Sequence, residues 1–195
     1  MDTTTLRKTL RARRTALSPH EQQSAREALA IRISEQPVFQ QSQHIALYLA
    51  SDGEIDPAGI VEMAWQQGKI CYLPVLNKQQ KGTLMFLPYT AETAMTNNRY
   101  GIPEPIADST TARQAKDLDL VLLPLTGFDA ACNRMGMGGG YYDRTFAFTQ
   151  SSSTTNPLLI GLAHECQKVD QLNTSPWDVP MHAIATDEHY YQKTN

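Results

Sequence analysis

Two apolar runs of strand type flank one helical pattern near the start of the chain, and this arrangement constrains the fold more than any other feature. The first run covers residues 45–50 and the second covers residues 69–75. Between them a helix starts at Asp56 and stops at Gly68. Strand, helix and strand within about 30 residues form a βαβ unit, which places both strands parallel in one sheet.

Further patterns extend this unit. Strands are predicted over residues 84–87, 118–124, 157–163 and 181–186, helices over 3–17 and 141–148, and a polar loop over 151–156. Ser18, Pro19 and Glu21 form the capping box of another helix. The predicted fold is one α/β domain over residues 1–195, three-layered, with helices flanking a mostly parallel sheet. N-terminal helices would occupy residues 1–36, and a sheet-containing core residues 44–191.

Composition narrows the class of protein. Of 195 residues, 41% are hydrophobic and 19% charged, which is ordinary for a globular domain. A net charge of −3 disfavours a general nucleic-acid binder. No apolar run approaches the ~18 residues that span a bilayer, and the polar N-terminus is not a secretory signal. Cys71, Cys132 and Cys166 are widely spaced, so we expect reduced thiols and a cytoplasmic protein that binds neither nucleic acid nor membrane.

The strongest functional feature is a glycine-rich segment over residues 133–144. Four glycines within positions 136–140 allow several backbone N–H groups to face one anion at a helix start, and phosphate is the natural ligand. The segment is not a Walker A loop, and Tyr141 replaces the third glycine of a dinucleotide fingerprint. Arg134 before it and Asp143 and Arg144 after it supply cation and metal chemistry. The alternative is a merely flexible loop.

Other candidate residues follow the carboxyl ends of the predicted strands, where open parallel sheets bind ligands. Asp143 and Asp178 are candidate magnesium ligands, or else caps or surface charges. Glu54 could accept two parallel hydrogen bonds from the amino-amide edge of a pterin or guanine, or it is a solvated acid. Tyr100 could stack on a flat heterocycle, or simply pack.

A basic run on the first helix has two interpretations. It consists of Arg7, Lys8, Arg11, Arg13 and Arg14. It is either a solvated helix face or an anion-binding arm, since guanidinium groups suit phosphates and carboxylates.

These motifs together carry a family resemblance over nearly the whole chain. They are LRK at residues 6–8, YLASDGEID at 48–56, GIPEP at 101–105, PLTGFD at 124–129 and NRMGMGGGYYDR at 133–144. The sequence resembles the 5-formyltetrahydrofolate cyclo-ligase family, also called methenyltetrahydrofolate synthetases. The resemblance implies an ATP- and Mg²⁺-dependent conversion of 5-formyltetrahydrofolate to 5,10-methenyltetrahydrofolate, through an iminium phosphate, with release of ADP and phosphate. The substrate would be mono- or polyglutamylated, and the enzyme a monomer.

The resemblance also implies residue roles. Arg134 and Tyr142 would be catalytic, and Asp143 and Asp178 would hold magnesium. The ATP site would consist of Arg7, Lys8, Arg134, Met135, Gly136, Met137, Gly138, Gly139, Gly140, Tyr141 and Tyr142. The substrate site would consist of Leu49, Glu54, Tyr100, Met137, Gly138, Gly139, Gly140 and Tyr141. The sequence departs from the family at Tyr100, where some relatives have tryptophan, and at Met137 and Gly139, where some have basic residues.

Two other classes stay open at this stage. The family's sheet resembles that of sugar-phosphate isomerases and CoA transferases, so a sugar-phosphate isomerase or acyl-CoA binder is one alternative. A non-catalytic nucleotide-binding regulator is the other. Release of ADP on mixing 5-formyltetrahydrofolate with magnesium ATP would distinguish all three.

Overall fold

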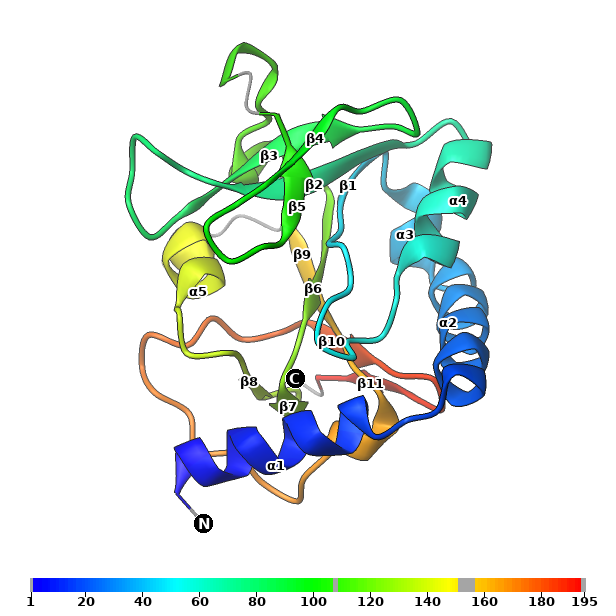
Figure 1. The fold of residues 1–195 in the computed structure, drawn as a ribbon, viewed down its shortest axis with the longest axis vertical. Helices are drawn as coiled ribbons and strands as arrows, with labels where there is room; N and C mark the ends of the chain where they lie inside the picture. Colours follow the sequence, from blue (N-terminus) through cyan, green and yellow to red (C-terminus); the bar gives the residue numbers. More distant parts are fainter. Residues whose placement is uncertain (1, 107–108, 151–156, 194–195) are drawn as a thin grey trace.

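A seven-stranded sheet organises the chain in the computed structural model, which describes residues 2–106, 109–150 and 157–193 (Figure 1). In spatial order its strands are β11 (Tyr190–Gln192), β10 (Ala183–Ala185), β9 (Leu158–Leu162), β6 (Leu120–Pro124), β1 (His44–Ala46), β2 (Ile70–Leu76) and β3 (Leu84–Tyr89). The five inner strands are parallel, and β3 and β11 run antiparallel at the two edges. The prediction of an α/β fold with a mostly parallel sheet is confirmed.

Helices cover both faces of this sheet. On one side lie α2 (Pro19–Ser34), α3 (Pro37–Gln41) and α4 (Ala58–Gln66), and on the other lies α5 (Tyr141–Phe146) (Figure 1). A hydrophobic core lies on each face of the sheet. Alternate residues of β6 pack into the two cores, because successive side chains of a strand point to opposite faces. Leu120 and Leu122 pack in the core below α2 and α4, whereas Val121 and Leu123 pack with Phe146 of α5.

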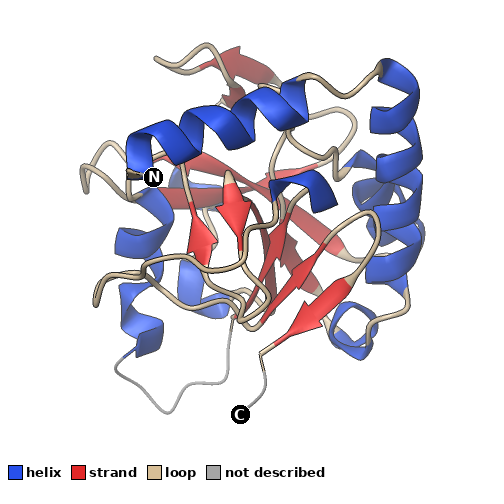
Figure 2. Cartoon of the chain, turned by 90° about the horizontal axis from the view of Figure 1, so that it is seen from below, coloured by secondary structure: helices blue, strands red, loops and turns tan. Residues whose placement is uncertain are grey.

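The remaining long helix, α1 (Thr3–Thr15), lies across the carboxyl ends of the parallel strands (Figures 1 and 2). Leu10 in its middle is fully buried. Arg14 donates to the carbonyl of Leu125, which directly follows β6, and to the carbonyl of Asp52, in the loop that follows β1. The helix therefore lies at the edge of the sheet where the sequence places its functional residues.

Local signals for helix ends agree with the structure. The predicted capping box of α2 is present: Ser18 Oγ accepts from the Glu21 amide at 3.3 Å, and the Glu21 carboxylate accepts from the Ser18 amide at 2.7 Å. Asp56 accepts from the Ala58 amide at 3.0 Å at the start of α4. Gly68 ends that helix in the left-handed region, at φ 69°, which favours glycine.

Several helices and strands begin or end at different residues from those predicted. The strand predicted over residues 45–50 is shorter, because pairing of β1 with β6 stops after Ala46. The first helix ends at Thr15 rather than residue 17, and α5 ends at Phe146 and continues as a 3₁₀ turn, Ala147–Gln150. The strand predicted over 181–186 contracts to β10. The polar loop predicted for residues 151–156 lies outside the described residues.

Short elements were not predicted. They are α3 and β11, the hairpin of β4 (Met95–Asn97) with β5 (Pro103–Pro105), the hairpin of β7 (Gly127–Phe128) with β8 (Arg134–Met135), and the 3₁₀ turns Ser109–Thr111, Ala115–Asp117 and Glu165–Gln167. Segments of two or three residues are too short to show a hydrophobic period. The hairpin strands pair with segments close in sequence, but the pattern of so few residues does not reveal the pairing.

Two further features bear on the class of protein. Within the described ranges, no helix is both long and apolar enough to cross a membrane. The three cysteines are free thiols, and burial raises the pKa of the Cys71 thiol to about 12. A thiol with this pKa is protonated at neutral pH and is a poor nucleophile.

Candidate functional site

The glycine-rich segment connects the β7/β8 hairpin to α5. In this hairpin Gly127 pairs with Met135, which fixes where the chain leaves the hairpin toward the glycines. Gly138 and Gly140 adopt left-handed backbone angles, with φ values of 92° and 64°, and Gly140 is the N-cap of α5. Side-chain-bearing residues avoid this region, so both turns depend on glycine. The exposed Gly138 and Gly139 leave backbone N–H groups accessible to a ligand.

Arg134 lies under this segment in a buried position. Its side chain is 7% exposed, and its Nη2 forms an ion pair with Asp143 Oδ1. Its Nε is buried and has no hydrogen-bond partner among the described residues. Burying an unsatisfied charged donor costs free energy, so this N–H is suited to donate a hydrogen bond to an anionic ligand.

A second guanidinium reaches the segment from α1. Arg7 Nε donates to the Gly136 carbonyl at 2.9 Å, and its guanidinium carbon lies 3.7 Å from where a Cβ on Gly138 would be. The structure thus brings Arg7 together with the glycine segment across 129 positions of sequence. Lys8, the next residue of the helix, is exposed.

The two predicted metal carboxylates come from segments that meet. Asp143 Oδ1 accepts from the amide of Val179, the residue after Asp178, at 3.1 Å. Asp178 Oδ2 accepts from the Ser175 amide at 2.7 Å, so in this state it also caps a turn. No cluster of three or more His, Cys, Asp or Glu side chains suited to a metal occurs in the part of the chain that the structure describes.

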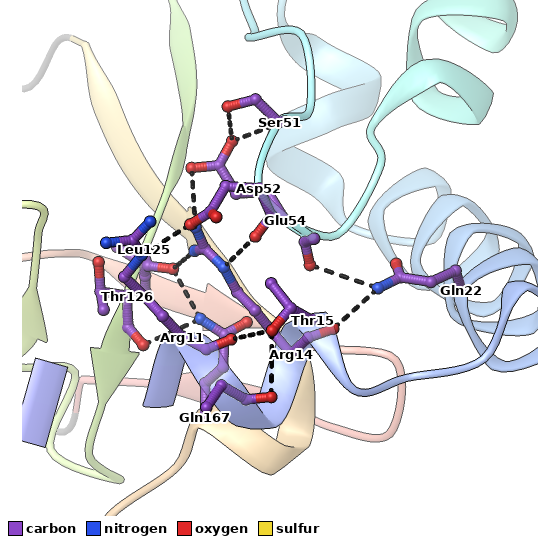
Figure 3. Close-up of polar contacts among 12 residues, drawn as sticks. Arg11, Arg14, Thr15, Gln22, Ser51, Asp52, Glu54, Leu125, Thr126 and Gln167 are labelled. Carbon is purple, nitrogen blue, oxygen red and sulfur yellow. Dashed lines mark hydrogen bonds and ion pairs between the residues drawn. The ribbon is translucent and has the colours of Figure 1, made fainter. Parts of the chain in front are cut away.

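Glu54 lies in a mostly buried position after β1 (Figure 3). Its side chain is 11% exposed, and Oε2 accepts from the amide and hydroxyl of Ser51 at 3.1 and 3.3 Å. Oε1 lies 3.7 Å from Nη2 of Arg14. Burial raises the pKa of Glu54, and the charge of Arg14 opposes this rise. Leu49, half-buried, precedes it on the same segment.

Tyr142, in α5, is influenced electrostatically by both Glu54 and Arg134. Burial raises the pKa of Tyr142, the charge of Glu54 raises it further, and the charge of Arg134 opposes both effects. The phenol therefore lies within electrostatic reach of the candidate substrate carboxylate and of the candidate phosphate cation. Its raised pKa keeps the hydroxyl protonated at neutral pH.

Tyr100 meets α5 through Tyr141. Their hydroxyl oxygens are 2.9 Å apart, and their rings pack edge to face with centroids 6.4 Å apart. Arg99, which the sequence did not single out, donates to both hydroxyls. Two predicted substrate residues are thus in contact, and Tyr100 remains 57% exposed.

Sequence reasoning placed Arg14 only within a basic run and missed its buried role. Arg14 is 1% exposed, so this part of the basic run is not a solvated helix face. A signal was present, because Arg7, Leu10 and Arg14 are spaced i, i+3 and i+7 and so share one side of the helix. Arg144 donates to the Gly82 carbonyl at 2.8 Å and lies over the Tyr141 ring, with 5.5 Å between guanidinium carbon and ring centroid.

This arrangement combines a glycine-lined cradle with two guanidinium groups at one end and a mostly buried carboxylate at the other. Comparison with known proteins decides its class. Residues 1–187 match the model of the 5-formyltetrahydrofolate cyclo-ligase family. The chain belongs to this family. Family membership confirms the resemblance predicted from the motifs.

Individual members of the cyclo-ligase family are similar along most of their length. The chain is 40% identical to the 5-formyltetrahydrofolate cyclo-ligase of Haemophilus influenzae over 175 residues, 90% of each chain. It is 37% identical to that of Escherichia coli K12 over 183 residues, 94% of this chain and 99% of the relative.

Solved structures of methenyltetrahydrofolate synthetases are also similar to this chain. The 5,10-methenyltetrahydrofolate synthetase of Mycoplasma pneumoniae superposes with a TM-score of 0.73 at 25% identity, covering 96% of this chain and 99% of that one. That of Aquifex aeolicus shares the fold, with a TM-score of 0.83 at 24% identity, covering 100% of this chain and 94% of that one.

Proposed function

We propose that this chain catalyses the reaction for which its family is named, the ATP-dependent cyclisation of 5-formyltetrahydrofolate to 5,10-methenyltetrahydrofolate with release of ADP and phosphate. The observation that supports this most is the buried Arg134 Nε without a partner among the described residues, placed beneath a glycine segment that Arg7 also reaches. A triphosphate supplies the anionic oxygens that such a cradle lacks.

The glycine segment would hold the phosphates of ATP. Backbone N–H groups of residues 136–140 would face the phosphate oxygens, with Arg7 and Arg134 balancing their charge. Arg134 would act on the transferring phosphoryl group, because the pairing with Asp143 already orients its guanidinium. Lys8, Met135, Met137, Tyr141 and Tyr142 complete the proposed nucleotide site.

Asp143 and Asp178 would hold Mg²⁺ when nucleotide is bound. Their carboxylate oxygens are the ligands that Mg²⁺ prefers, and the Val179–Asp143 bond brings their two segments together. Magnesium commonly takes one or two carboxylates and completes its coordination with phosphate oxygens and water, so a cluster of three protein ligands is not required. When bound, the ion would neutralise negative charge on the phosphates.

Glu54 would recognise the folate ring. Its carboxylate can accept two parallel hydrogen bonds from the amino-amide edge of the pterin, while Leu49, Tyr100 and the glycine segment would flank the ring. Tyr142 would remain a neutral hydrogen-bond donor that orients the substrate beside Glu54, since its raised pKa prevents it from acting as a base at neutral pH.

The reaction would proceed in two stages. The formyl oxygen attacks the γ-phosphorus of ATP, which breaks the bond to ADP and gives an N5-iminium phosphate. N10 then adds to the formyl carbon and loses its proton to solvent, and the carbon–oxygen bond breaks as phosphate leaves. The chain's residues would position the formyl group against the γ-phosphate and balance the charge that develops there. We place the enzyme in the cytoplasm, as a monomer that also accepts polyglutamylated substrate.

The test measures ADP release and formation of the methenyl product, with ATP, Mg²⁺ and 5-formyltetrahydrofolate supplied together and each omitted in turn. We expect ADP and product in equal amounts only when all three are present. ADP release without folate would indicate a simple ATPase. Absence of ADP release from folded protein that binds ATP would refute the proposal.

A further inference from the structure

Arg14 occupies an unusual position for a charged residue of a terminal helix. Its Nε donates to the Asp52 carbonyl at 2.9 Å, its Nη1 to the Leu125 carbonyl at 3.1 Å, and its Nη2 to the Asp52 carboxylate at 2.9 Å (Figure 3). The same Nη2 lies 3.7 Å from Glu54 Oε1. One buried guanidinium thus contacts the loop after β1 at three atoms and the chain after β6 at one.

The loop that Arg14 contacts has a backbone shape that needs support. Asp52 and Gly53 are both left-handed, with φ values of 52° and 72°. A Cβ on Gly53 would lie 3.1 Å from the Arg14 carbonyl oxygen, so the loop packs directly on the end of α1. Gln22 from α2 also donates to the carbonyls of Arg14 and Gly53. The conformation that precedes Glu54 therefore depends on contacts with α1.

Arg14 also provides the principal positive charge beside Glu54. Other charged or titratable described groups near this carboxylate or near Arg14 are Arg11 from α1, Asp52 on the same loop, Tyr48 after β1, Tyr142 from α5 and the buried His164. Arg11 is 43% exposed and its Nε pairs with the Asp52 carboxylate at 2.7 Å. Because solvent screens an exposed cation, the buried Arg14 has the stronger influence.

We propose that Arg14 is a positioning residue for substrate recognition, which holds the 51–54 loop in its left-handed turn and keeps the Glu54 carboxylate oriented and negatively charged toward the folate ring. This inference rests on the proposed role of Glu54. Under this inference α1 acts at two places, through Arg7 at the glycine segment and through Arg14 at the 51–54 loop.

The test compares Arg14→Met, Arg14→Lys and the matched control Arg11→Met. Dissociation constants for 5-formyltetrahydrofolate and for a non-hydrolysable ATP analogue are measured separately by calorimetry from about pH 6 to 9, and thermal melting checks the fold. Arg14→Met should weaken folate binding at neutral pH by about tenfold or more, the equivalent of one charge-assisted hydrogen bond. Affinity for the ATP analogue should change by less than about twofold, a small fraction of that loss.

The dependence of folate affinity on pH separates the effect of the Arg14 charge from the effect of its hydrogen bonds on loop shape. Without the cation, Glu54 takes up a proton at higher pH, so folate affinity of Arg14→Met should recover as the pH rises. Arg14→Lys keeps the charge, but its single nitrogen cannot reproduce the spacing of the three guanidinium nitrogens that donate here, so its profile should follow the parent while its affinity stays lower. Arg11→Met should resemble the parent in both respects. Equal losses for folate and nucleotide, or equal effects of Arg11→Met and Arg14→Met, would overturn the proposal.

A double-mutant cycle keeps the inference distinct from the function on which it rests. Glu54→Gln alone should weaken folate binding, and adding Arg14→Met to it should have little further effect, because Arg14 acts through Glu54. If Glu54→Gln leaves folate affinity unchanged, the proposed function of Glu54 fails. If Glu54→Gln weakens binding but Arg14→Met lowers affinity equally with and without it, only the positioning role fails.

Discussion

Replacing Gly138 with alanine adds a single Cβ to the glycine segment and so tests whether this segment binds phosphate. The nearest atoms to the added Cβ would belong to the Arg7 guanidinium at 3.7–3.9 Å, which is ordinary contact, so no clash results. The cost arises from the backbone, because φ at this position is 92°. An L-residue in the left-handed region is less stable by roughly 1–2 kcal/mol. For a domain of this size, about 1 kcal/mol corresponds to a loss of about 2–4 °C in melting temperature.

Gly68 provides the matched control. It has a φ of 69° and open space around it, and it lies at the end of α4. Gly68→Ala should therefore lower the melting temperature by a similar amount. Only Gly138→Ala should also weaken nucleotide binding, because relaxation of the strained turn moves N–H groups away from the phosphates.

Calorimetric titration with an ATP analogue provides the measurement. Loss of one charge-assisted hydrogen bond, about 1.5–3 kcal/mol, predicts an affinity lower by about ten- to 150-fold at about 1.4 kcal/mol per decade. Unchanged nucleotide affinity in folded Gly138→Ala, or an equal loss in Gly68→Ala, would refute the assignment of this segment to phosphate binding.

Three further predictions concern the metal, the helix and pH. Asp143→Asn should lower turnover even at saturating Mg²⁺, because it removes a proposed ligand and the partner of Arg134; parental turnover would remove Asp143 from the metal site. Gly127→Ala would place a Cβ 2.4 Å from a methyl of the fully buried Leu10, so it should reduce the free energy of unfolding in urea by about 1–3 kcal/mol, and an unchanged value would mean that α1 moves freely. Burial lowers the pKa of His164 below 6.5, so the unfolded chain binds more protons below this pH and stability should fall on acidification, by at most about 1.4 kcal/mol per pH unit. His164→Gln should flatten the dependence of melting temperature on pH, and an unaltered slope would assign it to other groups.

Long apolar strands and helix caps could be predicted because their signals are local. The strands β2, β6 and β9 are buried on both faces, so their sequences form continuous apolar runs, and the capping box of α2 lies within four residues. The two hairpins and the edge strand β11 pair with segments close in sequence, but their strands are too short to be recognised. Their two or three residues carry no period of their own. The end of β1 depends on its pairing with β2 and β6, which are distant in sequence.

In the candidate site, too, some residues could be predicted from local sequence and others could not. The density of glycines predicted the loop between β8 and α5, the place of Glu54 after a strand indicated a ligand contact, and the family resemblance indicated Arg7. Burial of Arg14 could not be predicted from its charge, because its acceptors Asp52 and Leu125 lie 38 and 111 residues away. Contact between Tyr100 and Tyr141 likewise joins segments 41 residues apart.

These separations imply an order of assembly. The partners of α1 lie up to 129 residues along the chain for Arg7 and 153 for Arg13, so the helix can dock only after most of the sheet exists. We therefore expect the cores on the two faces to form first and the site to be completed last. By the same reasoning, transient release of α1 would leave the sheet folded while both ends of the site lose an arginine, so loss of ligand binding would precede global unfolding.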